Sequence, residues 1–318
     1  MLKSLLQKIG LSKPPVDYTY TPDENHIEIL NFWTLQQNKE LWFYQYLLHH
    51  FSKQLGPHNS LLLSSVFGPR NRIAASKSRI KLFYTGENVV NFPEYADHCK
   101  RLVNLALGFD HLVSENYQRF PLWILYSFDA TADEQEIRRR LEHYTEENIC
   151  PDDQKKFASL ICRHDKNGLR TILFDALNQV DRVDSAGAYL RNTNDLQEKF
   201  QDNKIRFNGH YKFSICPENT NREGYVTEKV FEAIRSNTIP IYWGSNNNPE
   251  PEVLNKNAIL FYEGPESLPA LQKQIAELHT DPKLYREFMQ QPRFQPHAAE
   301  YVTELFNGFH TRLQKLLQ

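Results

Sequence analysis

Six polar residues of types that bind anions or sugars lie within one short stretch: Glu218, Asn219, Tyr225, Thr227, Glu228 and Lys229. The last of them begin a segment in which Val230, Phe231 and Ile234 repeat at helical spacing. A helix N-terminus attracts phosphate through its free N–H groups and its dipole. Lys229 opposes that dipole, so it is either a solvated surface lysine or a lysine held for an anionic ligand. Glu228 is open to a second interpretation, as an acid that favours the dipole.

The elements around this stretch form a repeat of strand, loop, helix and strand. Tyr211–Cys216 is an apolar run of strand length, and Thr227 can cap the helix that follows the polar loop. Ser236–Thr238 ends the helix, and Ile239–Trp243 is a second strand closed by Gly244. A unit of this length predicts two parallel strands. Because ligands of such sheets lie beyond the carboxyl ends of the strands, we expect the polar loop to line a binding site.

Two further candidates lie elsewhere in the chain. Glu87 follows the predicted strand Arg79–Tyr84, and Gly86 before it lets the backbone turn and approach a ligand closely. Spacing alone does not single out Glu87, because a lone loop glutamate is usually solvated. Arg170 lies in the first turn of a helix with apolar residues on one face over 169–177, and it is either an exposed arginine or a second cation for a ligand.

Composition limits the classes of function. The 318 residues suffice for two domains, and a net charge of −2 gives no electrostatic case for nucleic acid. The aromatic content of 13% suits stacking on sugars or a nucleobase, although most rings belong to the core. The four cysteines form no C-x-x-C pair, which argues against a zinc site and favours reduced thiols.

Strands and helices alternate along the rest of the chain, which predicts Rossmann-like domains. The first half is predicted to contain a long helix, Leu35–Leu55, and strands at Ile27–Trp33, Ser60–Phe67, Arg79–Tyr84, Leu102–Phe109 and Leu122–Tyr126. A basic helix, Glu134–His143, leads out of it. The second half is predicted to contain strands at Phe157–Cys162 and Ala258–Tyr262, a helix capped at Ser267, another near Pro282, and a final helix, Ala298–Leu317.

The string C-x-E-N-T…G-Y-V-T-E-K-x-x-x-A…T-I-P-I-Y-W-G, over residues 216–244, resembles the donor-binding signature of the α1,3/α1,4-fucosyltransferases, glycosyltransferase family 10. It is most similar to bacterial enzymes that build Lewis-type antigens on lipopolysaccharide, with further similar patches at Phe83–Asn88 and Leu169–Leu177. The resemblance implies an α/β fold of two Rossmann-like domains facing a cleft, the GT-B architecture. Residues 1–153 would bind the acceptor and 154–295 GDP-fucose, and the helix in 296–318 would return to the first domain. The absence of a D-x-D string fits, since that motif holds a metal in the other main architecture.

The resemblance also implies roles for the candidates. Glu87 matches the proposed general base, and Arg170 and Lys229 match cations on the nucleotide diphosphate. The donor residues implied are Glu218, Asn219, Tyr225, Thr227 and Glu228, with Arg191 as a third cation. The chain departs from the family at Val89–Val90 and at Arg163–His164, where relatives carry other residues.

The implied reaction is inverting transfer of L-fucose from GDP-fucose to the 3-hydroxyl, or the 4-hydroxyl, of N-acetylglucosamine in a glycan such as an O-antigen. No metal or obligatory cofactor is expected. Two alternatives are kept: an inverting enzyme for another nucleotide sugar, and a non-catalytic nucleotide-sugar-binding module, which would not need a base. If the charge of Lys229 lacks a partner until the anion binds, its replacement should leave the ligand-free protein at least as stable.

The first residues form a separate case. Leu2, Leu5, Leu6 and Ile9 share a helical face, but residues 1–13 are too short and too interrupted for a membrane span. A frayed terminus, a helix docked on the fold and a weak membrane-surface anchor all fit. We therefore expect a cytoplasmic bacterial protein with at most weak peripheral contact to the inner membrane.

Overall fold

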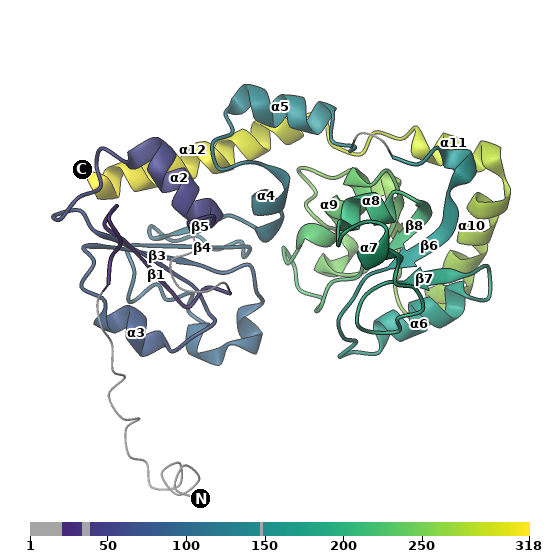
Figure 1. Ribbon diagram of the computed structural model, residues 1–318, viewed down its shortest axis with the longest axis horizontal. Coiled ribbons are helices and arrows are strands. Elements are labelled where there is room, and N and C mark those ends of the chain that lie inside the picture. Colours follow the sequence, from purple (N-terminus) through teal and green to yellow (C-terminus); the bar gives the residue numbers. More distant parts are fainter. Residues whose placement is uncertain (1–20, 34–38, 147–148) are drawn as a thin grey trace, which may run out of the picture.

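The computed structural model describes residues 21–33, 39–146 and 149–318. It contains two units side by side, each built on a five-stranded parallel sheet (Figure 1). The predicted features of residues 1–13 lie outside the described residues. Within the described residues, no helix is both long and apolar enough to cross a membrane.

The sheet of the first unit contains β1 (Ile27–Leu30), β2 (Leu61–Ser64), β3 (Ile80–Tyr84), β4 (Leu105–Gly108) and β5 (Tyr117–Arg119), in that spatial order. Its strands are almost wholly buried, as expected for a parallel sheet with both faces covered. The helices of this unit are α2 (Trp42–Phe51), α3 (Arg70–Ala75), α4 (Leu122–Ser127) and α5 (Glu134–Glu142). Figure 1 shows α2 and α3 on opposite faces of the sheet.

Two predictions for the first unit need correction, one in the bounds of a helix and one in the type of an element. The helix expected from Leu35 begins only at Trp42, after a turn at Lys39 and Glu40, and residues 34–38 lie outside the described residues. The run Leu122–Tyr126 is a helix, α4, rather than a strand, and the fifth strand lies just before it. A short apolar run fits a buried strand and a buried helix equally well. Tertiary packing favours the helix at this position. The indole of Trp123 stacks on Phe231 of the second unit, with ring centroids 4.3 Å apart.

The sheet of the second unit contains β6 (Lys156–Leu160), β7 (Val183–Ser185), β8 (Tyr211–Ile215), β9 (Ile239–Tyr242) and β10 (Leu260–Phe261), in the spatial order β10-β9-β8-β6-β7. Phe213 of β8 lies opposite Ile239 of β9 in parallel register, which confirms the predicted unit around residues 211–244. The chain passes from β6 to β7 on one side and then to β8 on the other. This reversal makes the carboxyl ends of β6 and β8 the expected ligand position.

Helices cover both faces of the second sheet (Figure 1). They are α6 (Leu169–Leu177), α7 (Asp195–Glu198), α8 (Lys204–Asn208), α9 (Glu228–Arg235), α10 (Leu268–Thr280) and α11 (Pro282–Met289). Ser267 precedes α10 as predicted, but its side chain makes no capping hydrogen bond.

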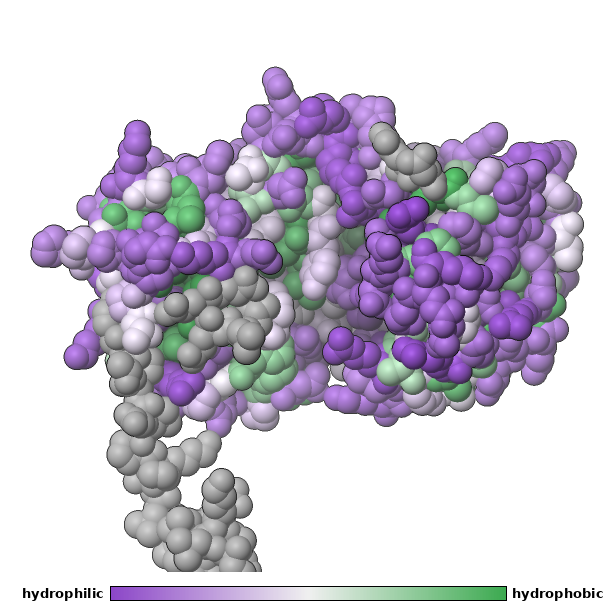
Figure 2. Space-filling model, viewed as in Figure 1, coloured by the Kyte–Doolittle hydropathy of each residue, from purple (hydrophilic) through white to green (hydrophobic). Residues whose placement is uncertain are grey.

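The last helix, α12 (Ala298–Leu317), returns to the first unit, where it packs on α5 and β5 (Figure 1). Gln118 Nε2 of β5 donates to the carbonyl of Leu305 at 2.7 Å. Apolar residues of α4, α9 and α12 belong to one buried cluster that continues from the first unit into the second. In the space-filling view, hydrophobic residues are visible where the two units meet below α5 (Figure 2).

Candidate functional site

Glu87 lies just past the carboxyl end of β3, near enough to Lys229, Glu228 and Glu218 of the second unit for their charges to act on it. Thr85 Oγ1 accepts the backbone N–H of Glu87 at 3.0 Å, which fixes the turn. Gly86 is needed because a Cβ there would lie 2.8 Å from Leu122 Cδ1 of α4. Because Gly86 has no Cβ, the backbone just before Glu87 can lie against α4.

The carboxylate of Glu87 is partly buried and accepts no hydrogen bond from any described residue. Burial raises the pKa of Glu87 above its usual range; Lys229 opposes this, while Glu228 and Glu218 add to it. A carboxylate with a raised pKa and no partner among the described residues is a better proton acceptor than an ordinary one.

Glu218 organises the start of α9. Its side chain is completely buried, and its Oε2 accepts Lys229 Nζ at 2.8 Å. Oε1 accepts the Thr227 backbone N–H at 2.7 Å, and the Thr227 hydroxyl lies within 3.0 Å of both oxygens. Gly244 makes room, because a Cβ there would lie 2.8 Å from Glu218 Cβ, and its φ is +141°. The carboxylate of Glu218 thus binds protein groups and positions Lys229.

This arrangement corrects two expectations. Thr227 stands at the N-cap position of α9, but its side chain makes no capping bond and is hydrogen-bonded to Glu218 instead. Lys229 is not an unpaired cation in the first turn, since Glu218 neutralises it in the absence of any ligand. Burial disfavours its charge, yet Glu218 and Glu228 raise the pKa of Lys229 on balance. The premise that the charge of Lys229 lacks a partner without ligand does not hold, so its removal is now expected to destabilise the ligand-free protein, because a buried carboxylate would lose its partner.

Arg170 is buried in the first turn of α6, with 5% of its surface exposed. Its Nη1 donates to the His164 carbonyl at 2.6 Å, and its Nη2 donates to Asn219 Oδ1 at 2.8 Å. Asp165 accepts the backbone N–H groups of Arg170 and Thr171 at 3.2 and 2.8 Å, so it caps the helix. Arg170 is thereby held rigidly and orients Asn219.

Arg170, Glu228 and Lys229 line one small cavity at the carboxyl ends of β6 and β8, as the reversal of strand order predicts. Its volume is about 60 Å³, and Lys204 and Glu232 complete its charged lining. Burial above all raises the pKa of Glu232 to about 7. Tyr225 is buried beside this region, where its ring meets Phe109 of the first unit edge-on at 5.1 Å. Arg191 is exposed, donates to the Gly187 carbonyl, and does not line the cavity.

The loop that carries Glu218 and Asn219 is joined to the first unit by polar contacts. Asn88, next to Glu87, donates to Thr220 Oγ1 at 3.0 Å and accepts from Arg222 Nη1 at 2.8 Å. Arg222 also forms an ion pair of 2.8 Å with Asp110, which follows β4. These contacts set the position of Glu87 relative to the cavity.

Sequence reasoning missed Lys204, Glu232, Asn88 and Arg222. Glu232 had a signal, since it lies four residues after Glu228 on the same helix face. Lys204 and Arg222 had none, because only the tertiary fold brings them to the site. Within the described residues, no group of three or more His, Cys, Asp or Glu side chains is arranged to hold a metal ion.

Two family models match the chain. "Glycosyltransferase family 10 (fucosyltransferase) C-term" matches residues 150–309, and "Alpha-(1,3)-fucosyltransferase FucT N-terminal domain" matches residues 27–126. The chain is 30% identical to alpha-(1,3)-fucosyltransferase FucT of Helicobacter pylori over 259 residues, which are 71% of this chain and 51% of that protein. It is 35% identical to alpha-(1,3)-fucosyltransferase B of Drosophila melanogaster over 119 residues, 34% of this chain and 26% of that one. The chain spans about half the length of FucT and less of the other.

Crystal structures of α1,3-fucosyltransferase have the same fold. One superposes with a TM-score of 0.60 at 21% identity, and one with GDP-fucose with a TM-score of 0.58 at 23% identity. Each comparison covers 98% of this chain and 97% of the other. The predicted fold class of two Rossmann-like units is confirmed.

Proposed function

The chain belongs to glycosyltransferase family 10, the fucosyltransferases, and we propose that it transfers L-fucose from GDP-fucose to the 3-hydroxyl of N-acetylglucosamine in a glycan. The observation that carries this proposal is the position of Glu87, which accepts no hydrogen bond from the described residues and lies near Lys229 and Glu228 of the donor cavity. A nucleotide-binding module has no use for such a base.

In the proposed reaction, the acceptor hydroxyl attacks the anomeric carbon of fucose from the face opposite the diphosphate. Glu87 takes the proton of that hydroxyl as the new C–O bond forms. The bond between fucose and the β-phosphate breaks, and GDP leaves with the electron pair, so the anomeric configuration inverts. Arg170 and Lys229 stabilise the negative charge of the departing diphosphate. Glu228, Asn219 and Tyr225 contact the fucose and ribose, while Glu218 and Thr227 act through Lys229.

We assign GDP-fucose to residues 154–295 and the acceptor to residues 1–153, with 296–318 bracing the first unit. The cavity at the ends of β6 and β8 supports the first assignment, and Glu87 at the end of β3 supports the second. We further propose a bacterial cytoplasmic enzyme acting on an O-antigen-like glycan, on the strength of the match to the H. pylori protein.

Incubation with GDP-fucose and a panel of type 1 and type 2 disaccharides tests the function. Formation of a fucosylated product linked at O3 is expected, and linkage at O4 would correct the regiochemistry. Turnover with a different nucleotide sugar but not with GDP-fucose would contradict the donor. GDP binding without any transfer would indicate a binding module.

Transfer is also expected to need no added metal, because Arg170 and Lys229 can stabilise the negative charge of the diphosphate. The protein is dialysed against EDTA and assayed with and without Mn²⁺ or Mg²⁺. Complete loss of transfer, restored only by a divalent ion, would overturn the assignment of Arg170 and Lys229.

A further inference from the structure

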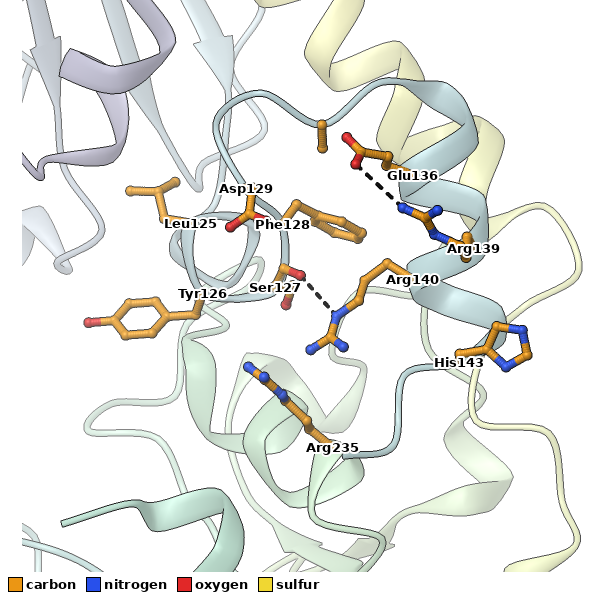
Figure 3. Close-up of a pocket in the computed structure, with 11 residues that line it drawn as sticks. Leu125, Tyr126, Ser127, Phe128, Asp129, Glu136, Arg139, Arg140, His143 and Arg235 are labelled. Atoms are coloured by element: carbon orange, nitrogen blue, oxygen red, sulfur yellow. Dashed lines mark hydrogen bonds and ion pairs between the residues drawn. The ribbon is translucent and has the colours of Figure 1, made fainter. Parts of the chain in front are cut away.

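A second cavity lies apart from the donor cavity, between α4, α5 and the carboxyl end of α9 (Figure 3). Its volume is about 560 Å³. Both units contribute to it: Arg139, Arg140 and His143 belong to the first, and Arg235 belongs to the second. None of these residues has a role in the proposed transfer.

Arg140 brings a positive charge to this cavity, which Glu146 and Asp129 stabilise from a distance. Its Nε is 3.4 Å from the carbonyl oxygen of Ser127, and its guanidinium lies 5.0 Å from the centroid of the Tyr144 ring. No carboxylate of a described residue forms an ion pair with it. Burial first, and then the charge of Arg235, lower the pKa of Arg140.

Arg235 faces Arg140 across the cavity, and the two guanidinium groups point toward one another (Figure 3). Glu146 holds Arg235 through its Nε and Nη2, at 2.8 and 2.7 Å from Glu146 Oε2. Two guanidinium groups fixed in this way repel one another when nothing lies between them. A planar guanidinium pairs with phosphate oxygens through two parallel hydrogen bonds, so an oxyanion between the two would relieve the repulsion.

Neither carboxylate of the lining forms an ion pair with Arg140. Glu136 pairs with Arg139 at 3.4 Å and completes the capping box of α5 with Asp133, at the other end of the cavity (Figure 3). Asp129 is exposed, so solvent weakens its attraction for Arg140. The positive charge of the Arg140 end is thus available to a ligand.

Tyr126 connects this cavity with the catalytic region. It lines the cavity, half exposed, and its ring points away from the arginines (Figure 3). Burial first, and then the nearby Glu228 and Glu232, raise the pKa of Tyr126 to about 12, and Glu87 contributes in the same direction. The proposed base therefore lies near a residue that lines this cavity.

We propose that this cavity binds a phosphate-type oxyanion between Arg140 and Arg235. The oxyanion is either a free phosphate or diphosphate, or a phosphate group carried by the acceptor glycan. The binding itself is independent of the proposed fucosyl transfer, whereas its delivery by the acceptor rests on that function.

The binding is tested by calorimetric titration of the full chain with inorganic pyrophosphate in the presence of saturating GDP, which occupies the donor cavity. Arg140→Gln is expected to weaken pyrophosphate binding about tenfold or more, since a charged hydrogen bond is lost. Arg140→Lys keeps the charge but not the paired geometry. Its affinity for pyrophosphate should therefore lie between those of the parent and Arg140→Gln. Arg138→Gln removes the same charge from the same helix, but Arg138 pairs with Glu300 outside the cavity, so it should bind like the parent.

No pyrophosphate binding to the GDP-saturated parent would overturn the proposal, as would equal affinities for Arg140→Gln and Arg138→Gln. Unfolding of each variant in urea shows whether a loss of binding reflects a loss of fold. If the chain does not bind GDP at all, the proposed function fails, while the comparison of the two arginine variants still tests the cavity.

The source of the oxyanion is tested with one N-acetylglucosamine disaccharide, neutral or carrying a phosphate at its reducing end. If the acceptor delivers the phosphate, the parent should show a lower KM for the phosphorylated form, and Arg140→Gln should lose that preference with kcat for the neutral form unchanged. Equal KM values in the parent, together with pyrophosphate binding, would assign the cavity to a free oxyanion and overturn delivery by the acceptor.

Discussion

The two sides of the proposed site differ in how their charges are satisfied. In the second unit, Lys229 is paired with Glu218 at 2.8 Å, and Arg170 donates to Asn219 at 2.8 Å. In the first unit, the Glu87 carboxylate has no hydrogen-bond donor among the described residues, and burial raises its pKa. The cations are therefore held in position before a ligand arrives, which reduces the cost of ordering them when it binds. The base, in contrast, stays available for a proton.

The loop that carries Glu218 contacts the first unit, and these contacts keep the two sides of the site in a fixed relative position. Asn88 adjoins Glu87 and bonds to Thr220 and Arg222 of the loop that carries Glu218. A shift of one unit against the other would break these bonds. These contacts thus link the separately held base and cations across the two units.

The largest effect is expected on the side of the base. Glu87→Gln should lower the rate of transfer ~10²–10⁴-fold, because the amide cannot accept the proton of the acceptor hydroxyl. GDP binding should not change, since no described donor-side group bonds to Glu87. Because burial raises the pKa of Glu87, activity of the parent should fall with decreasing pH at values above the usual carboxyl range.

Initial rates and GDP titrations of the variant and the parent check this prediction. Glu266→Gln, which neutralises an exposed carboxylate remote from the site, is the matched control. Transfer by Glu87→Gln at a rate close to that of the control would remove Glu87 from the mechanism.

The next effect concerns Lys229, whose two roles can be measured separately. Lys229→Met should weaken GDP binding by ~1.5–3 kcal/mol, the value of a charged hydrogen bond. It should also lower the free energy of unfolding without ligand by ~1–3 kcal/mol, because the buried Glu218 carboxylate loses its cation. Urea unfolding and GDP titration give the two quantities.

The variant Glu218→Gln and the double variant complete this comparison. If the pair acts as a unit, the losses in unfolding free energy should not add, and the double variant should be more stable than the sum predicts. Ligand-free Lys229→Met with the stability of the parent would show that Glu218 does not depend on Lys229. A loss of stability with unchanged GDP affinity would make Lys229 purely structural.

A smaller effect is expected from Glu232, which lines the donor cavity. Its pKa is raised from the ordinary value of 4.5 to about 7, mainly by burial. Between these pH values the folded protein binds more protons at this group than the unfolded chain, so the free energy of unfolding falls as the pH rises through this range. Glu232→Gln removes the group and should stabilise the protein by ~1–3 kcal/mol at pH 8, with no gain at pH 4.

Unfolding of Glu232→Gln and the parent in urea at pH 4 and pH 8 tests the direction of this pH dependence. Glu277→Gln removes an exposed carboxylate, with 55% of its side chain accessible, and should give no such pH-dependent difference. A gain of equal size at pH 4 and pH 8 would mean that the side chain acts through packing and not through its charge.

Some elements of the fold could be predicted from the sequence, and others could not. The unit around residues 211–244 was predicted correctly, because strand, loop and helix signals are local and the connection length determines parallel pairing. Helix α4 was not predicted correctly. The choice between strand and helix at Leu122–Ser127 depends on the packing of Trp123 against Phe231, which lies far along the chain.

The same limit applies to the site. The residue types at Glu87, Arg170 and Lys229 could be selected by a motif, but their partners could not. That Glu218 neutralises Lys229 depends on Gly244, which opens space at the end of the next strand. That Arg140 faces Arg235 depends on how the two units meet, which no spacing within either unit encodes.

The smallest effect is expected at Arg191, and it tests how far the donor side extends. The resemblance to family 10 implies a third cation for the donor at this position, but Arg191 is exposed and bonds to the Gly187 carbonyl outside the cavity that Arg170 and Lys229 line. Arg191→Gln should therefore change GDP affinity and unfolding free energy by less than ~0.5 kcal/mol, as for most surface substitutions. GDP titrations of this variant are compared with those of Arg170→Gln, which loses a buried cation of the same type. Should Arg191→Gln weaken GDP binding tenfold or more, the loop 187–193 must close over the donor when it binds, and the preformed site would be only part of the donor side.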